Sequence, residues 1–180
     1  QKETRGLGHA ISCAKAFVGD EPFAVLYGDD VILGEDPACG QLIRAYNETG
    51  KGVVGVKEVS EEAIQRYSSL KVEPLHDNWF TCTDMIEKPS KDKIMSLYSI
   101  LGRCVLPPQI FDILAHTAPG AGGEIQLTDA MCELARTESM IAVDFTGKRY
   151  PAGDFLDEAG RKVGTHKGAV RYTIGQRKGL

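Results

Sequence analysis

Short apolar runs that end in polar turns alternate along most of the chain with stretches of helical spacing. Residues 23–27 form one such run, which stops at Gly28-Asp29-Asp30, and residues 53–56 form a second. Continuous apolar runs of this length are typical of buried strands. Further strands are predicted at 70–72, 79–83, 102–106 and 140–145.

Helical patterns separate these strands. Apolar residues at helical spacing predict a helix over 9–17, and Pro37 at a first helical position predicts another up to about Tyr46. Ser60 before two glutamates is typical of an N-cap. The other predicted helices lie at about 109–116 and 125–136. Strands that alternate with helices predict an α/β layered fold with a mostly parallel sheet, which binds ligands at the carboxyl ends of its strands.

The charge of the chain changes sign near its end. The 180 residues carry a formal net charge of −4, of which residues 1–153 contribute −7 and residues 154–180 contribute +3. We therefore expect one domain over 1–152, followed by a short β-rich appendage over 153–180 that is rich in Gly and basic residues. The acidic main part argues against a general nucleic-acid binder. No apolar run approaches the roughly 20 residues that a membrane span needs.

The cysteines favour a reducing compartment. There are five, at positions 13, 39, 82, 104 and 132, with no CxxC pair. Most lie in apolar stretches, so free buried thiols in the cytoplasm are favoured over disulfides or a zinc site. The polar start of the chain shows no signal peptide and no initiator Met, which suggests a beginning inside a longer protein.

Two segments offer sites for anions and metals. The glycines of Gly6-Leu-Gly-His9 precede a predicted helix, where a ligand can approach the backbone and the helix N-terminus favours anions. An ordinary turn before a helix explains them as well. The carboxylates of Gly28-Asp-Asp30 follow a strand and suit Mg²⁺, although a solvated acidic turn has the same composition.

Two further segments suit sugar phosphates. In Glu87-Lys-Pro89 the Glu can accept hydrogen bonds from sugar hydroxyls and the Lys can neutralise a phosphate. A surface ion pair ahead of a proline turn is the alternative. In residues 119–129 a glycine loop leads into a helix, and a structural cap of that helix accounts for much of the pattern.

Six motifs, taken together, resemble one family over about residues 1–150. They are Gly6-Leu-Gly-His-Ala10, Val18-Gly-Asp-Glu-Pro22, Gly28-Asp-Asp30, Ile86-Glu-Lys-Pro89, Leu101-Gly-Arg103 and residues 119–130. Their order and spacing resemble bacterial UTP–glucose-1-phosphate uridylyltransferase. The resemblance implies a Rossmann-like nucleotidyltransferase fold with flanking helices. It also implies an enzyme that makes UDP-glucose and pyrophosphate from UTP and glucose 1-phosphate with Mg²⁺, and a homo-oligomer is an open expectation.

The resemblance also implies roles for single residues. Gln1 and Gly6 match positions that contact the uracil, and Gly8 belongs to the same substrate-binding segment. Asp29 or its neighbour Asp30 matches the Mg²⁺-binding carboxylate, and Asp29 is preferred.

The Glu-Lys pair completes the implied site. Glu87 matches the ligand of the glucose hydroxyls, and Lys88 matches the residue that faces the sugar phosphate. Lys88 and Asp29 are therefore the expected catalytic residues. Two anions meet in this reaction, so positive charge near the phosphates is the main requirement.

Three departures from the family put full activity in doubt. The family begins with a strand and a basic, Gly-rich loop around the triphosphate, which this sequence does not supply, so we expect impaired activity. Ser68 stands where the family has a Gly near the sugar, and its Cβ would crowd glucose or strain the backbone. Pro151 follows Gly147-Lys-Arg-Tyr150, where the family has an Asp that related enzymes use as a metal ligand.

After about Gly153 the sequence resembles a second family. Residues 155–168 and the string Tyr172-Thr-Ile-Gly-Gln-Arg-Lys-Gly-Leu180 are similar to bacterial tRNA-specific 2-thiouridylase, without its ATP motif or catalytic cysteines. That resemblance implies a weak tRNA contact and a junction near 150–154. A non-catalytic tRNA-binding fragment and a chimeric fragment without activity therefore stay open as alternatives.

Overall fold

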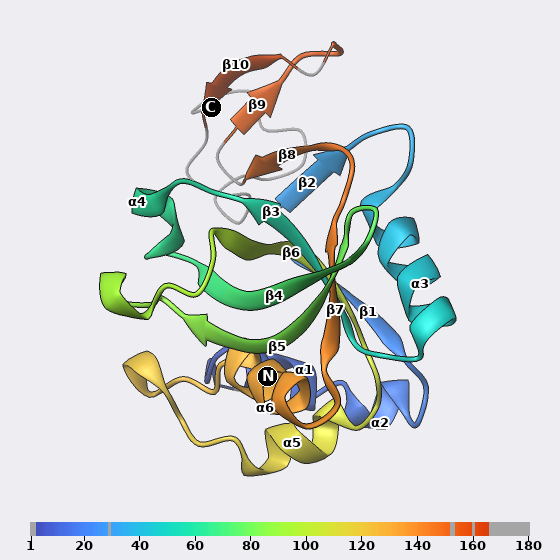
Figure 1. Ribbon diagram of the computed structural model, residues 1–180, viewed down its shortest axis with the longest axis vertical. Helices are drawn as coiled ribbons and strands as arrows, with labels where there is room; N and C mark the ends of the chain where they lie inside the picture. The colour runs from blue at the N-terminus through green and yellow to red at the C-terminus, as the bar shows by residue number, and fades with distance from the viewer. Residues whose placement is uncertain (1–2, 29, 152–153, 160, 166–180) are drawn as a thin grey trace.

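The computed structural model describes residues 3–28, 30–151, 154–159 and 161–165 (Figure 1). Its main element is a six-stranded sheet in the order β1-β6-β3-β7-β5-β4. These strands are β1 (Phe23–Leu26), β3 (Val53–Glu58), β4 (Ser68–His76), β5 (Trp79–Glu87), β6 (Tyr98–Leu106) and β7 (Met140–Asp144). Two ribbons complete the strands, β2 (Asp30–Leu33) with β8 (Lys148–Pro151) and β9 (Asp154–Leu156) with β10 (Lys162–Thr165).

Helices cover both faces of the large sheet (Figure 1). They are α1 (Leu7–Ser12), α2 (Lys15–Val18), α3 (Ala38–Thr49), α4 (Glu61–Ile64), α5 (Ile110–His116) and α6 (Leu127–Glu138), with 3₁₀ turns η1 (Lys91–Lys93) and η2 (Ala121–Gly123). Helices α1, α5 and α6 contact one another on one side, and α3 packs on β3, β6 and β7 on the other. Because side chains alternate along a strand, Val54 and Val56 join the α6 side while Val53 joins the α3 side.

The predicted elements within the described residues are present, with small shifts of their bounds. Helix α3 follows Pro37 and ends at Gly50, whose φ of 65° is left-handed. Ser60 Oγ caps α4 by accepting a hydrogen bond from the Ala63 N–H at 3.2 Å. The single helix predicted over 9–17 is instead two short helices, since Cys13 ends α1 before α2 begins. The weak alternation over 170–174 lies outside the described residues.

The α/β prediction is confirmed, but the sheet is mixed and not mostly parallel. Only the β3–β7 pair of the large sheet is parallel, and the pairs β1–β6, β3–β6, β5–β7 and β4–β5 are antiparallel. The direction of β5 follows from the β4–β5 hairpin, in which Asp77 adopts a φ of 47° in a tight turn. A hairpin needs only a few connecting residues, whereas a parallel pair needs a long crossover.

Strand β1 forms one edge of the large sheet. It pairs with β6 on one side, and no strand pairs with its other side in the part of the chain that the structure describes. Two of its four side chains, Ala24 and Leu26, are exposed, and Leu26 keeps 54% of its surface. Nearby in the sequence, Phe17 is 95% exposed.

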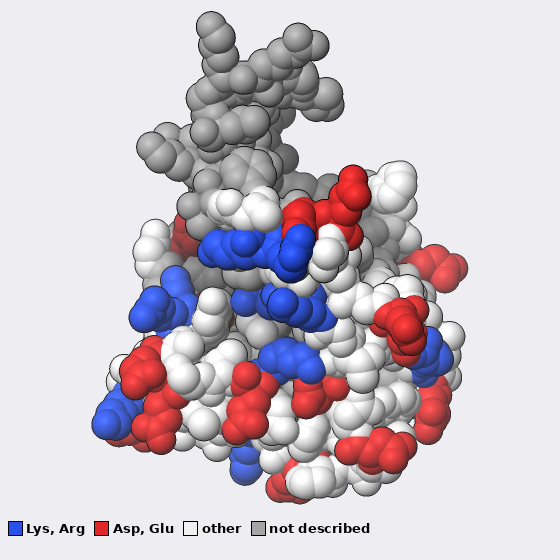
Figure 2. Space-filling model, turned by 90° about the horizontal axis from the view of Figure 1, so that it is seen from above, with Lys and Arg blue, Asp and Glu red and all other residues white. Residues whose placement is uncertain are grey.

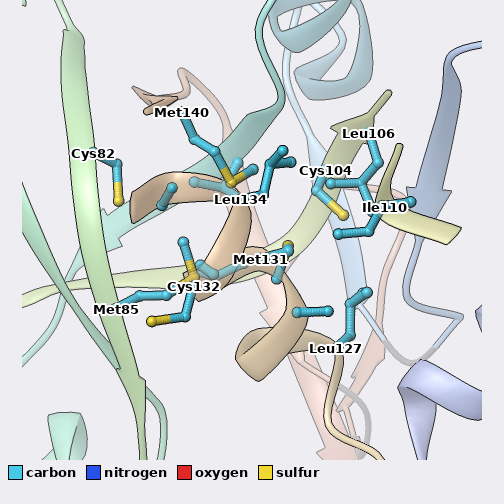
Figure 3. Packing of buried hydrophobic residues seen from close by; sticks show 14 of the residues in the cluster. Cys82, Met85, Cys104, Leu106, Ile110, Leu127, Met131, Cys132, Leu134 and Met140 are labelled. Carbon is cyan, nitrogen blue, oxygen red and sulfur yellow. The ribbon is translucent and has the colours of Figure 1, made fainter. Parts of the chain in front are cut away.

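Met and Cys side chains belong to the larger of the two buried hydrophobic clusters, the one on the α6 side of the sheet. Figure 3 shows Cys104 beside Leu106 and Ile110, with Met131 and Leu134 of α6 facing the sheet. Cys82, Cys104 and Cys132 are buried and Cys13 is exposed, and all five cysteines are free. The prediction of free thiols is thus confirmed, and burial holds for most of them. No helix among the described residues is long and apolar enough to cross a membrane.

Candidate functional site

A cavity of about 160 Å³ brings together segments that are far apart in the sequence. It is lined by Leu7, Tyr27, Tyr67, Ser68, Glu87, Ile100, Gln126, Leu127 and Thr128. The lining therefore includes residues from three of the four predicted segments. Tyr27 directly precedes the fourth, Gly28-Asp-Asp30, at the end of β1. The folded chain thus brings three of the four segments to one opening, and Glu87 is the residue with a predicted role that lines it.

Glu87 is held at the end of β5 by α6. Thr128 Oγ1 donates a hydrogen bond to Glu87 Oε2 at 2.9 Å. This bond fixes one carboxylate oxygen and turns the carboxylate toward the cavity that both residues line. Thr128 was not predicted to be a functional residue from the sequence. Its signal was present in the motif, because Thr128 lies in the first turn of the helix that the glycine loop opens.

Lys88 lies directly after β5 in an uncommon backbone conformation. Its φ is 46°, and its backbone N–H donates to the Tyr67 carbonyl at 2.8 Å. A positive φ in a residue other than Gly is uncommon and marks a position that the surrounding structure determines. The side chain of Lys88 is exposed. Lys88 is therefore fixed at its backbone to a residue that lines the cavity.

Ser68 fits an ordinary strand. It is 4% exposed, its Oγ accepts from the Ile100 N–H at 3.2 Å, and it lies 3.3 Å from Ser99 Oγ. Ser68 opens β4 opposite Glu87 and is not among the described residues with a positive φ. The expected backbone strain is therefore absent. The Ser68 hydroxyl instead accepts a hydrogen bond from the backbone of β6.

Gly6 and Gly8 are required by close packing. The Gly8 N–H donates to the Ile125 carbonyl at 2.8 Å, and a Cβ at Gly8 would lie 2.8 Å from that oxygen. A Cβ at Gly6 would lie 2.6 Å from the same atom, and Gly6 also has a φ of 94°. These contacts place α1 against the residues that precede α6. Gln1, the other predicted uracil contact, lies outside the described residues.

Asp30 is buried in an ion pair. Its Oδ1 accepts from Arg149 Nε at 2.9 Å and from Nη2 at 2.8 Å, and its side chain is only 5% exposed. A Cβ at Gly102, which has a φ of 74°, would lie 2.7 Å from Asp30 Oδ2. The Asp30 carboxylate is thus enclosed between Arg149 and the backbone of β6. Asp29, the preferred metal ligand, lies outside the described residues.

The described residues do not by themselves fit a magnesium site. They contain no group of three or more His, Cys, Asp or Glu side chains that could hold a metal ion. Within the β2–β8 ribbon, the register pairs Asp30 with Pro151. A carboxylate at position 151 would therefore stand across from Asp30, and proline has none to offer.

A larger cavity, of about 490 Å³, lies between η1, β5 and α6. Its lining includes Asp129 of the predicted 119–129 segment, but none of the residues to which the resemblance gives a role. Asp84 in this lining is paired with Arg136 at 2.9 Å and accepts from Cys132 Sγ at 3.1 Å. Its acidic group is therefore already satisfied, so size alone does not make this cavity the reactive site.

Solved structures define the class of protein to which this fold corresponds. A UDP-glucose pyrophosphorylase complexed with UDP-glucose matches with a TM-score of 0.80 at 38% identity, over 83% of this chain and 58% of that chain. A UTP-bound UGPase from Acinetobacter baumannii matches with a TM-score of 0.72 at 30% identity, over 83% of this chain and 52% of that one. The fold is therefore the nucleotidyltransferase fold of the UDP-glucose pyrophosphorylases.

Curated relatives narrow this class. The chain is 46% identical over 174 residues to UTP–glucose-1-phosphate uridylyltransferase 2 of Staphylococcus saprophyticus, covering 97% of this chain and 58% of the relative. It is 45% identical over 156 residues to UTP–glucose-1-phosphate uridylyltransferase of Bacillus subtilis, covering 87% of this chain and 53% of the relative. The similarity to UTP–glucose-1-phosphate uridylyltransferase is thus confirmed. The chain spans a little over half the length of these relatives.

A family model described as the tRNA methyl transferase PRC-barrel domain matches residues 144–180. This match agrees with the change in sequence character near Gly153. The alignment with the S. saprophyticus relative covers 97% of the chain, so it also extends into this region. The division into domains at 152 and 153 therefore stays a prediction.

Proposed function

We propose that the chain is the sugar-nucleotide-binding part of a UTP–glucose-1-phosphate uridylyltransferase, and that the cavity at Glu87 receives the glucose unit. The observation that carries this proposal is the convergence of Tyr27, Tyr67, Glu87 and Thr128 on one opening. A carboxylate fixed through one oxygen and flanked by tyrosines is suited to bind sugar hydroxyls. The named relatives support the choice of UDP-glucose as the product.

The reaction proposed for the site is an in-line transfer of the uridylyl group. A phosphate oxygen of glucose 1-phosphate attacks the α-phosphorus of UTP, and the bond to the β-phosphate oxygen breaks to release pyrophosphate. Lys88 offsets the charge of the two anions as they meet, and Glu87 orients the sugar. No covalent bond to the protein forms, so positioning and charge supply the catalysis.

Basic side chains on one face of the molecule favour the binding of anions there. Figure 2 looks onto the end of the molecule that carries β2 and β8, and it shows Lys and Arg side chains gathered across this face with acidic side chains beside them. The protein as a whole is acidic, with a formal net charge of −4. A local concentration of cations on an acidic protein steers nucleotides to one face.

Magnesium is part of the proposal through Asp29. The family resemblance assigns this carboxylate to the metal, while Asp30 is already committed to Arg149. When bound, the metal would offset negative charge on the phosphates. The five free thiols and the small-molecule substrates also suit a cytoplasmic enzyme.

Isothermal calorimetry with UDP-glucose tests the proposal. The unaltered chain is expected to bind, and Glu87→Gln is expected to weaken binding at least tenfold, because hydroxyl hydrogen bonds to a charged acceptor contribute about 1.5–3 kcal/mol. Lys88→Ala is expected to weaken binding as well. Glu58→Gln, an exposed glutamate at the end of β3, is the matched control and should bind normally.

Turnover is a separate measurement. Pyrophosphate release from UTP and glucose 1-phosphate is expected to be slow, because Pro151 stands where the resemblance expects a metal-binding Asp. The proposal fails if the unaltered chain does not bind UDP-glucose, or if Glu87→Gln and Glu58→Gln bind equally well.

A second candidate function rests on the match of residues 144–180 to a tRNA methyl transferase PRC-barrel domain. This segment would make the chain a non-catalytic tRNA-binding fragment. Filter binding of tRNA that weakens steeply with salt, together with no binding of UDP-glucose, would support this function instead.

A further inference from the structure

Arg149 contacts two separate walls of the proposed site. On one side its guanidinium donates twice to Asp30 Oδ1, at 2.9 and 2.8 Å. On the other side its guanidinium carbon lies 5.8 Å from the centre of the Tyr67 ring. The side chains of Arg149 and Asp30 are only 21% and 5% exposed, so solvent screens this pair weakly.

The turn before β2 is held at both ends by arginines. Arg103 Nη2 donates to the Asp30 carbonyl at 2.8 Å, and its Nη1 lies 3.3 Å from the Tyr27 carbonyl, which accepts. Arg149 holds the Asp30 side chain in addition. Asp29 stands between Tyr27 and Asp30 in the sequence, so these contacts fix the two ends of the segment that carries it.

Tyr67 connects Arg149 to the sugar-binding wall. Its backbone carbonyl accepts from the Lys88 N–H at 2.8 Å, and Tyr67 lines the same cavity as Glu87. The planar guanidinium can donate to a carboxylate along its edge while its face lies over an aromatic ring. A lysine ammonium offers only a point charge and cannot make both contacts in this way.

We propose that Arg149 is a positioning residue that couples the turn before β2, through Asp30, to the Tyr67 wall of the sugar-binding cavity. This inference deepens the proposed function and rests on it. Arg149 does not touch the reacting atoms. It fixes the separation between Asp30 at the start of β2 and the Tyr67 wall of the cavity.

Calorimetry with UDP-glucose and with UMP separates this role from simple stabilisation of the fold. Arg149→Met is expected to weaken UDP-glucose binding about tenfold, or about 1.4 kcal/mol, and UMP binding less than twofold. A loss of folded protein would instead weaken both ligands by the same factor. Lys148→Met is the matched control on the same strand, because Lys148 is exposed and contacts the Tyr150 ring.

Arg149→Lys keeps the charge facing Asp30 and provides the test if Arg149→Met does not fold. It is expected to melt within a few degrees of the unaltered chain and still to lose affinity for UDP-glucose more than for UMP. Equal losses for the two ligands, or normal UDP-glucose binding by Arg149→Lys, would overturn the role of Arg149. Absence of UDP-glucose binding by the unaltered chain overturns the proposed function itself, before any variant is compared.

Discussion

Gly8 shows how the absence of a side chain lets a helix pack closely against a neighbouring segment. Its N–H donates to the Ile125 carbonyl, and a Cβ would lie 2.8 Å from that oxygen and 2.9 Å from Ile125 Cγ2. Gly8→Ala is therefore expected to lower the free energy of unfolding by about 1–3 kcal/mol, because the backbone must move apart. Urea denaturation followed by circular dichroism measures this change.

Gly40→Ala is the control for that substitution. Gly40 lies inside α3, and a Cβ there would meet only Arg44 Nη1 at 3.6 Å, which is an ordinary contact. The same chemical change should therefore raise the free energy of unfolding by about 0.5–1 kcal/mol. If both variants change stability in the same direction, close packing is not the reason for Gly8.

The cysteines differ in reactivity because they differ in burial. Desolvation raises the pKa of Cys82 to about 12, and burial likewise raises the pKa of Cys104 to about 12. Cys13 is exposed. Because the thiolate is the reactive form, Ellman's reagent at pH 8 is expected to modify Cys13 first and to reach Cys82 and Cys104 only after unfolding.

Cys13→Ser should remove the fastest phase of this reaction. A fast phase that persists in this variant would mean that a second thiol is accessible in the folded protein. The expected protection also has a pH consequence. A thiol whose pKa is raised by folding contributes stability below its ordinary pKa near 9, and that contribution is lost as the pH rises toward 12.

Residue types alone predicted part of the site. Glu87 was predicted from its Glu-Lys-Pro motif after an extended run, and it lines the cavity. Gly6 and Gly8 were expected before a helix, but Gly8 lies inside α1 and both glycines are required by close packing on the Ile125 carbonyl. Thr128 and Arg149 were not predicted as functional, because their partners are 41 and 119 positions away in the chain. Only the three-dimensional arrangement brings such groups together.

At the scale of elements, an ion pair as well as apolar packing holds α6 against β5. Arg136 pairs with Asp84 at 2.9 Å. Burial acts to raise the pKa of Asp84, but hydrogen bonds from Cys132, Arg136 and the Met85 N–H outweigh it and lower the pKa. A carboxylate with a lowered pKa stabilises the fold above its ordinary pKa near 3.9, and this contribution is lost as the pH falls further.

Arg136→Met is expected to lower the melting temperature at pH 7, with a loss of at most about 1 kcal/mol because the guanidinium is 63% exposed. The difference between the variant and the unaltered chain should shrink as the pH falls below the ordinary carboxylate pKa of about 3.9, because protonation of Asp84 removes the ion pair. Lys93→Met changes the same charge in the lining of the same cavity without removing the Asp84 ion pair. A constant difference between the two melting curves at every pH would argue against the ion pair.

The order of elements was predictable, but the direction of the strands was not. Apolar runs near 70 and 79 predicted strands correctly, yet periodicity does not tell a hairpin from a crossover connection. Asp77 makes the turn of the hairpin with a positive φ, which Asp tolerates better than most residues. The Asp77-Asn78 turn was the available signal for the antiparallel pair.

At the scale of the whole molecule, the β2–β8 ribbon joins residues 30–33 to residues 148–151, which are far apart in the sequence. Its register sets Asp30 opposite Pro151. We expect Pro151→Asp to add a carboxylate beside the turn that carries Asp29 and so to strengthen metal binding at least tenfold, since added oxygen ligands are what Mg²⁺ requires. Titration with Mn²⁺, followed by electron paramagnetic resonance, measures this affinity.

Asp154→Asn serves as the control, because Asp154 follows the ribbon closely in the sequence and the change alters no proline. It should leave Mn²⁺ affinity unchanged or slightly weaker. If Pro151→Asp binds Mn²⁺ no better than the unaltered chain, position 151 does not face a metal site.

Strand β1 has a consequence for the behaviour of the protein at high concentration. The outer N–H and C=O groups of a strand that has a neighbour on one side only can hydrogen-bond to a strand of another molecule. Leu26, with 54% of its surface exposed, adds an apolar side chain to this edge strand, which favours association. Concentrated samples are therefore expected to self-associate with time by extension of the sheet. Leu26→Lys should slow this association, which is measured as a slower rise in light scattering.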